Sequence, residues 1–146
     1  WLKGRNTPMN LVLFSNFSWI NAQYIRSKDN AIKGKKVEYV PEIMWRTGLN
    51  FSYKNFKATY QFSYLGEQFS DATNSVFNPS AVTGLIPSYT VMDFSLSYTY
   101  KFMKFAAGVN NLTDERYFTR RAAAYPGPGI IPATARSFYL SVGAKL

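Results

Sequence analysis

The sequence predicts an all-β fold of antiparallel strands, and three observations support that prediction. Apolar and polar residues alternate with a period of two over several stretches of roughly ten residues. Aromatic residues make up 18% of the 146-residue chain, and aromatic side chains favour the pleated surface of a sheet. Short links join some of these stretches, as in tight hairpins. We therefore expect one structural unit that is built of strands.

The clearest pair of strands lies in the first half of the chain. Over Glu42–Tyr53 the odd positions are apolar or aromatic except for Thr47, and the even positions are mostly polar or small. After Lys54-Asn55 the alternation restarts and continues over Phe56–Tyr64. A two-residue link fits a β-hairpin, and Asn tolerates the positive φ that such turns need. The pattern therefore predicts two strands joined by a tight turn.

The second half of the chain repeats this pattern. A strand is predicted over Met92–Tyr100, and a short link at Lys101–Lys104 leads from it into a strand over Phe105–Val109. This arrangement predicts a second tight hairpin. A last strand is predicted over Phe138–Leu146, where apolar residues again occupy every second position.

An earlier strand, over about Leu11–Ile25, is less regular. Its apolar face switches between Phe14 and Phe17, and we expect a β-bulge at that point. With this strand the chain has about six strands of roughly ten residues. Strands of that length cross a bilayer when they are tilted by about 45°.

The connections alternate between long and short, in the order 26–39, 54–55, 66–89, 101–104 and 111–135. Outer-membrane barrels have short periplasmic turns and long extracellular loops, whereas soluble barrels show no such asymmetry. The sequence therefore predicts part of an antiparallel transmembrane β-barrel. Because the smallest such barrels have about eight strands and lipid does not tolerate open edges, we expect further strands upstream. A soluble sandwich or barrel with the apolar face as its core is the alternative.

Composition excludes several other classes of protein. No stretch approaches the roughly 20 apolar residues of a membrane-spanning helix. Histidine and cysteine are absent, and the eight acids show no metal-type spacing, so we expect neither an enzyme nor a resident cofactor or metal. The net charge of +9 comes without a nucleic-acid-binding signature, so no nucleic-acid partner is expected. The chain begins at Trp1 without a leader, and any export signal is expected upstream.

The stretch Gly108–Tyr117 resembles the barrel-end motif of TonB-dependent outer-membrane receptors, in which a strand runs through an Asn-Asn-Leu turn into the last extracellular loop. Asn110, Asn111 and Asp114 are expected to bond neighbouring backbone groups where the ladder stops. Three later segments look like the ferric citrate receptor branch of that family, namely Tyr117–Ala122, Tyr125–Pro132 and Arg136–Tyr139.

The resemblance implies a barrel of about 22 strands whose lumen holds an N-terminal plug. Residues 1–146 would form its C-terminal part, about the last six strands, without the plug and the earlier strands. The implied function is TonB-dependent uptake of an iron chelate across the outer membrane. The implied partners are ferric citrate or another siderophore, TonB through the missing plug, and outer-membrane lipid with lipopolysaccharide. A passive porin-type or structural barrel is the alternative, and a vitamin or glycan is an alternative cargo.

Arg120 and Arg121 are the leading candidates for ligand binding. Ferric citrate complexes are anionic, and a guanidinium group matches a carboxylate in bidentate fashion. Tyr125 lies in the same predicted loop and is a candidate for stacking or hydrogen bonding. The alternative is that these arginines pair with nearby acids or with lipopolysaccharide phosphates. A second basic segment, which contains Lys33, Lys35 and Lys36, is expected to face solvent or lipid phosphate, or else to attract the same anions.

Overall fold

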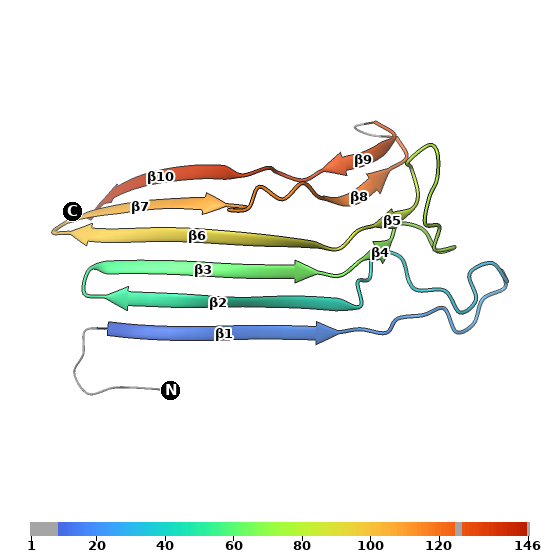
Figure 1. Ribbon diagram of the computed structural model, residues 1–146, viewed down its shortest axis with the longest axis horizontal. Helices are drawn as coiled ribbons and strands as arrows, with labels where there is room; N and C mark the ends of the chain where they lie inside the picture. The colour runs from blue at the N-terminus through green and yellow to red at the C-terminus, as the bar shows by residue number, and fades with distance from the viewer. Residues whose placement is uncertain (1–8, 125–126, 146) are drawn as a thin grey trace.

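The computed structural model describes residues 9–124 and 127–145. Its main body is one six-stranded antiparallel sheet in the order β1-β2-β3-β6-β7-β10 (Figure 1). These strands are β1 (Met9–Trp19), β2 (Ile43–Tyr53), β3 (Phe56–Leu65), β6 (Tyr89–Tyr100), β7 (Met103–Asn110) and β10 (Ser137–Ala144). The two short hairpins pair β4 (Gln68–Phe69) with β5 (Leu85–Ile86), and β8 (Phe118–Ala122) with β9 (Gly129–Pro132). The predicted set of six antiparallel strands is confirmed. Among the described residues no helix is long and apolar enough to span a membrane.

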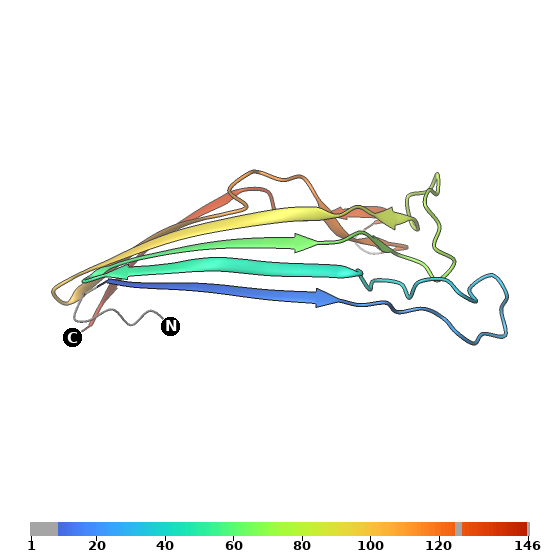
Figure 2. The ribbon, with the colours of Figure 1, turned by 60° about the horizontal axis from the view of Figure 1, so that its bottom comes forward.

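The long and short connections lie at opposite ends of the sheet (Figure 1). The two tight turns occupy residues 54–55 and 101–102, and the long loops span 20–42, 66–88 and 111–136. The sheet is curved, as Figure 2 shows. Its outer strands, β1 and β10, have no further strand beside them in the part of the chain that the structure describes. The predicted alternation of long and short connections is therefore confirmed.

Every strand pair of the main sheet keeps an unbroken register. The β-bulge predicted in β1 is wrong, because β1 and β2 pair without a shift from Met9 opposite Tyr53 to Trp19 opposite Ile43. Phe14 simply belongs to the other face of the sheet. β1 also ends at Trp19, well before the predicted end of that strand at residue 25.

One face of the sheet is mostly apolar, and no second layer of the described structure covers it. It includes Leu13, which is 74% exposed, and Leu140, which is 79% exposed. Ile86 is the single buried hydrophobic residue among those described, and it lies in a loop hairpin. A soluble sandwich covers such a face with a second layer. The described residues supply no such second layer for this face.

Two glycines on the polar face make room for aromatic rings of neighbouring strands. Phe14 lies opposite Gly48, where a Cβ atom would fall 2.5 Å from the ring. Tyr139 lies opposite Gly108, where a Cβ atom would fall 2.6 Å from the tyrosine hydroxyl oxygen. Both rings therefore occupy the space that a side chain at the opposite glycine would need.

Lysine occupies the strained position of both tight turns. Lys54 has a φ of 51° and Lys101 a φ of 52°. The expectation that Asn55 would adopt the positive φ is wrong, because the first turn residue does so. Each lysine places its ammonium group over the ring of the preceding tyrosine, at 5.4 Å for Tyr53 and 5.5 Å for Tyr100. A cation over an aromatic face is attracted by the ring electrons.

The glycine at position 108 gives a test of this packing. We expect Gly108→Ala to destabilise the complete protein by roughly 1–3 kcal/mol, because the new methyl group overlaps the Tyr139 ring. In a protein that already carries Tyr139→Ala, Gly108→Ala should cost little further stability, since the three atoms nearest to the added Cβ all belong to the Tyr139 side chain. Thermal unfolding of the four proteins in detergent measures the coupling. Additive losses would contradict the proposed overlap.

Candidate functional site

The first two long loops are joined by an asparagine side chain. The Oδ1 atom of Asn74 accepts a hydrogen bond from the Lys36 N–H at 2.7 Å, and its Nδ2 atom donates to the Lys36 carbonyl at 2.8 Å. A second link runs from the Tyr39 N–H to the Phe69 carbonyl, at 2.8 Å. The Asn74 amide thus replaces one rung of a backbone ladder, and it fixes loop 66–88 against loop 20–42.

Arg121 joins the second and third long loops. Its two terminal nitrogens donate to the carbonyl groups of Ala81 and Leu85, at 2.9 and 2.8 Å, across a sequence separation of 40 and 36 residues. The guanidinium group also lies 5.1 Å from the centre of the Phe118 ring. Its Nε atom is buried and has no hydrogen-bond partner among the described residues. This predicted ligand residue therefore holds loops 66–88 and 111–136 together.

Arg120, the preceding residue on β8, lies in a different environment. Its backbone pairs with Ile131 of β9, and its side chain is exposed. No salt bridge to an acid of the described chain involves Arg120. Its guanidinium group is thus accessible to an anion from solvent. The third predicted ligand residue, Tyr125, lies outside the described residues.

The predicted structural role of the Asn-Asn-Leu turn is confirmed at Asn111. This residue is only 3% exposed and has a φ of 53°. Its N–H donates to the Asp93 carboxylate at 2.9 Å, and its side chain exchanges two 2.9 Å hydrogen bonds with the backbone of Glu115. Asn110 departs from the prediction, because it bonds the Ser137 hydroxyl and not a backbone group. Asn111 therefore closes the turn where β7 ends.

Asp114 connects the two ends of loop 111–136. Its carboxylate accepts a hydrogen bond from the Arg136 N–H at 2.9 Å and pairs with the Arg116 guanidinium at 3.0 Å. The hydrogen bond from the Arg136 backbone is the main reason that the pKa of Asp114 lies below its ordinary value of 3.8. The ionised carboxylate thus draws the start of loop 111–136 towards the residue just before β10.

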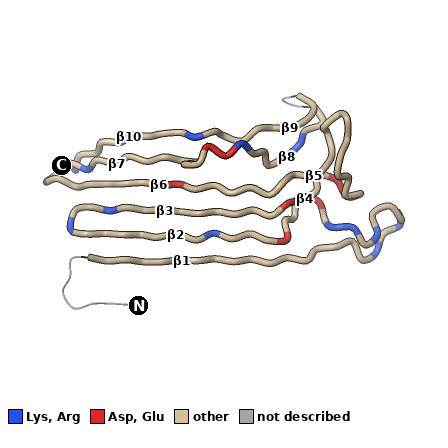
Figure 3. The backbone as a smooth tube through the Cα atoms, viewed as in Figure 1, with Lys and Arg blue, Asp and Glu red and all other residues tan. Residues whose placement is uncertain are grey.

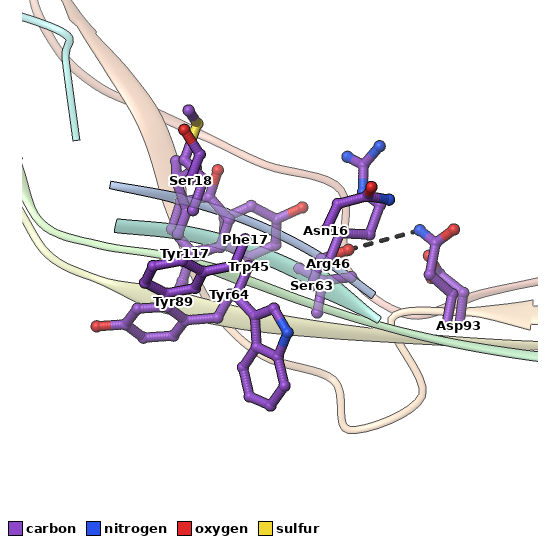
Figure 4. A pocket seen from close by; sticks show the side chains of 14 residues that line it. Asn16, Phe17, Ser18, Trp45, Arg46, Ser63, Tyr64, Tyr89, Asp93 and Tyr117 are labelled. Carbon is purple, nitrogen blue, oxygen red and sulfur yellow. Dashed lines mark hydrogen bonds between the residues drawn. The ribbon is translucent and has the colours of Figure 1, made fainter. Parts of the chain in front are cut away.

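A hollow of about 630 Å³ opens on the polar face near the loop end of the sheet (Figure 4). The rings of Tyr89 and Tyr117 stack at one side of it, with centroids 4.2 Å apart. Arg46 and Asp93 also line the hollow, and no salt bridge joins them. Polar and aromatic side chains in an open hollow suit non-covalent contact with a polar partner. No cluster of three or more metal-ligating side chains occurs in the described part of the chain.

Comparison with known proteins identifies the family. A sequence model for the β-barrel of TonB-dependent-receptor-like proteins matches residues 2–112, which is more than half of the chain. The chain belongs to the TonB-dependent receptor β-barrel family. Its antiparallel strands have the barrel fold of this family, although the described residues do not close the barrel. The resemblance inferred from Gly108–Tyr117 is thereby confirmed. No curated protein sequence matches the chain.

Several solved receptors share the fold. The ferric citrate transporter FecA in its unliganded form is 22% identical, with a TM-score of 0.81, over 90% of this chain and 20% of that chain. The ferric-catecholate import receptor Fiu from E. coli K12 is 19% identical, with a TM-score of 0.71, over 90% and 18%. The siderophore receptor PiuA from Acinetobacter baumannii is 21% identical, with a TM-score of 0.70, over 90% and 19%. This chain thus spans about a fifth of the length of these receptors.

Sequence reasoning missed the residues that connect the long loops. The sequence predicts only a connecting loop around Asn74, and the contact that its side chain makes with Lys36 spans 38 residues. A weak signal was available, because Asn adopts positive φ more readily than most residues, and Asn74 has a φ of 55°. The short hairpins β4–β5 and β8–β9 were also missed, since two to five residues are too few to show alternation.

Replacement of Arg121 tests its role as the link between loops. We expect Arg121→Met in the complete protein to increase hydrogen exchange in segments 76–86 and 118–132 by about tenfold or more, because two hydrogen bonds to a charged group are lost. Arg120→Met serves as the control, since its exposed side chain holds no loop. Equal protection in both variants would show that Arg121 does not join the loops.

The lowered pKa of Asp114 predicts a pH dependence. Because the folded-state pKa lies below 3.8, the ionised carboxylate stabilises loop 111–136 at pH values above 3.8. This contribution is lost as the pH falls through the lowered pKa. Limited proteolysis by an acid-active protease should therefore cut this loop faster at the lowest pH values. In the Asp114→Asn variant, the rate at which the protease cuts this loop should change less with pH. An equal change with pH in the variant and the wild type would contradict the assignment.

Proposed function

We propose that the chain is part of the wall of an outer-membrane receptor that imports an iron chelate with energy supplied through TonB. The single observation that supports this most is the combination of an uncovered apolar face with three long loops gathered at one end. An apolar face of strands about ten residues long suits the hydrocarbon of a bilayer. Membership of the receptor family supports the remaining steps, and we propose no catalytic role.

The orientation follows from the loops. In outer-membrane barrels the long loops lie outside the cell and the short turns lie on the periplasmic side. Loops 20–42, 66–88 and 111–136 are therefore proposed to face the exterior, where a chelate arrives. The unpaired edges at β1 and β10 are proposed to join earlier strands of the same receptor, because lipid does not tolerate unpaired backbone groups. The chain then forms the C-terminal part of the barrel, and the TonB-contacting plug precedes it.

The hollow on the polar face is proposed to lie inside this barrel. Its lining includes tyrosine, arginine and aspartate side chains. These lie on the same face of the sheet as the rings of Phe14 and Tyr139, which pack against glycines of the neighbouring strands. A passive porin with the same wall was the alternative from the sequence. No feature of the described residues favours it, and the family match to receptors favours a plugged lumen.

Ferric citrate is the proposed ligand, and Arg120 is the proposed contact. Support comes from the exposed guanidinium group at the loop end, from the anionic nature of the chelate, and from the structural likeness to the ferric citrate transporter. Arg121 adds positive charge near the ligand without contacting it, while its hydrogen bonds hold the loops in place. Another siderophore, a vitamin or a glycan would use the same wall with different loop contacts.

Binding and uptake of labelled ferric citrate by cells that express the complete protein test this proposal. We expect Arg120→Gln to weaken ferric citrate binding by about tenfold or more, because a charge-assisted contact of about 1.5–3 kcal/mol is removed. Arg116→Gln removes a charge from the same loop that is already paired with Asp114, and it should bind nearly as the wild type does.

Two outcomes would contradict separate parts of the proposal. Equal binding by Arg120→Gln and the wild type would remove Arg120 from the site. Uptake of a different chelate, with no uptake of ferric citrate, would change the ligand and leave the receptor assignment intact. Absence of the complete protein from the outer-membrane fraction would overturn the localisation and the function together.

A further inference from the structure

The tip of the first long loop carries a dense group of positive charges. Between positions 26 and 36 a single acid, Asp29, accompanies the cations Arg26, Lys28, Lys33, Lys35 and Lys36. We call the first four of these cations the basic tip. Lys36 pairs with Glu42 at 3.0 Å, whereas no member of the basic tip forms a salt bridge within the described chain. All four of its side chains are exposed.

The acids of loop 20–42 are occupied elsewhere. Glu38 accepts a 2.6 Å hydrogen bond from the Tyr24 hydroxyl. Asp29 accepts a 2.8 Å hydrogen bond from the Ala31 N–H and so caps a turn. With Glu42 bound to Lys36, none of these carboxylates pairs with the basic tip. The tip therefore presents positive charge that the loop itself does not neutralise.

The backbone holds the basic tip in a defined shape. The N–H of Tyr24 donates to the Lys35 carbonyl at 2.9 Å, and the Gly34 N–H donates to the Tyr24 carbonyl at 2.8 Å. An isolated bridge pairs Gln23 with Lys36, whose backbone is also fixed by Asn74. A tip that is ordered before binding loses little conformational entropy when it meets a partner. The basic tip can therefore bind a polyanion with a small loss of backbone conformational entropy.

The position of the basic tip favours a lipid partner over a soluble chelate. The loop follows β1 directly, whose last residue Trp19 is 68% exposed on the apolar face. Ile25, next to Arg26, is 81% exposed. An exposed apolar residue among cations is typical of surfaces that meet anionic lipid. Figure 3 shows that the tip lies beyond β1 and β2, whereas β8 and its arginines lie at the opposite side of the sheet.

We propose that the basic tip binds phosphate groups of the lipid that borders the loop end of the apolar face. This inference rests on the proposed function, because it requires the apolar face to lie in a membrane. Phosphate oxygens accept charge-assisted hydrogen bonds from lysine and arginine, and several neighbouring cations bind a bisphosphorylated headgroup more strongly than one does. The tip then anchors loop 20–42 at the membrane surface while the other loops remain free for ligand.

The test uses the complete protein in detergent and diphosphorylated lipid A with a fluorescent label as the probe. The variant neutralises three exposed cations of the tip, with the substitutions Lys28→Gln, Lys33→Gln and Lys35→Gln. We expect its affinity for the probe to fall by about tenfold or more, and the wild-type affinity to fall with added salt. The matched control removes the same charge at the opposite end of the sheet, through Lys54→Gln, Lys101→Gln and Lys104→Gln, and should keep the wild-type affinity.

Four outcomes separate the sources of the anion and distinguish this inference from the proposed function. Dephosphorylated lipid A should bind the wild type and the tip variant equally, and a difference there would overturn the role of phosphate. Loss of ferric citrate binding in the tip variant, with unchanged lipid A affinity, would assign the tip to chelate capture and overturn the inference. Equal losses in the tip variant and the matched control would also overturn it. Wild-type protein outside the outer-membrane fraction would instead refute the proposed function.

Discussion

The structure depends on an unbroken backbone ladder behind an apolar face that no other part of the described chain covers. An unpaired N–H or C=O group in an apolar surrounding costs roughly several kcal/mol, so a ladder next to hydrocarbon tolerates few gaps. All five strand pairs of the main sheet meet this demand, because their registers run without a shift. The one register shift in the paired strands lies between Phe118 and Arg120, in a loop hairpin away from the sheet. The irregular pairing is thus confined to the end of the sheet that carries the long loops.

In the long loops, where the strands of the main sheet have ended, side chains supply the hydrogen bonds to backbone groups. Asn74 gives loop 66–88 a rung on Lys36, and Asn111 satisfies the turn at the end of β7. Arg121 does the same for the carbonyl groups of Ala81 and Leu85. Asn74 and Arg121 each bond backbone groups of another loop, so the three long loops form one connected structure. The hydrogen bonds between the loops therefore define the shape of this end of the sheet.

The main sheet could be predicted from the sequence because alternation is a local signal. The alternation misled at Phe14, because an aromatic residue on the polar face looks like a switch of the apolar face. The ring fits there because Gly48, 34 positions away in the sequence, leaves room for it. The site was less predictable. Arginine at 120 and 121 signalled anion chemistry, but the division of roles between them depends on Ala81 and Leu85, which sequence spacing does not connect to them.

The two arginines differ because β8 is a strand. Successive side chains of a strand point to opposite sides, so one guanidinium group turns towards loop 66–88 and the other towards solvent. The inward group, Arg121, meets carbonyl dipoles and no acid of the described chain, so its full charge persists in a partly dry environment where fields extend further than in water. An anion held by Arg120 would feel that second charge without touching it. Arg121→Gln would then weaken anion binding by a field effect even where the loops keep their shape, whereas a purely structural link would weaken binding only as far as the loops loosen.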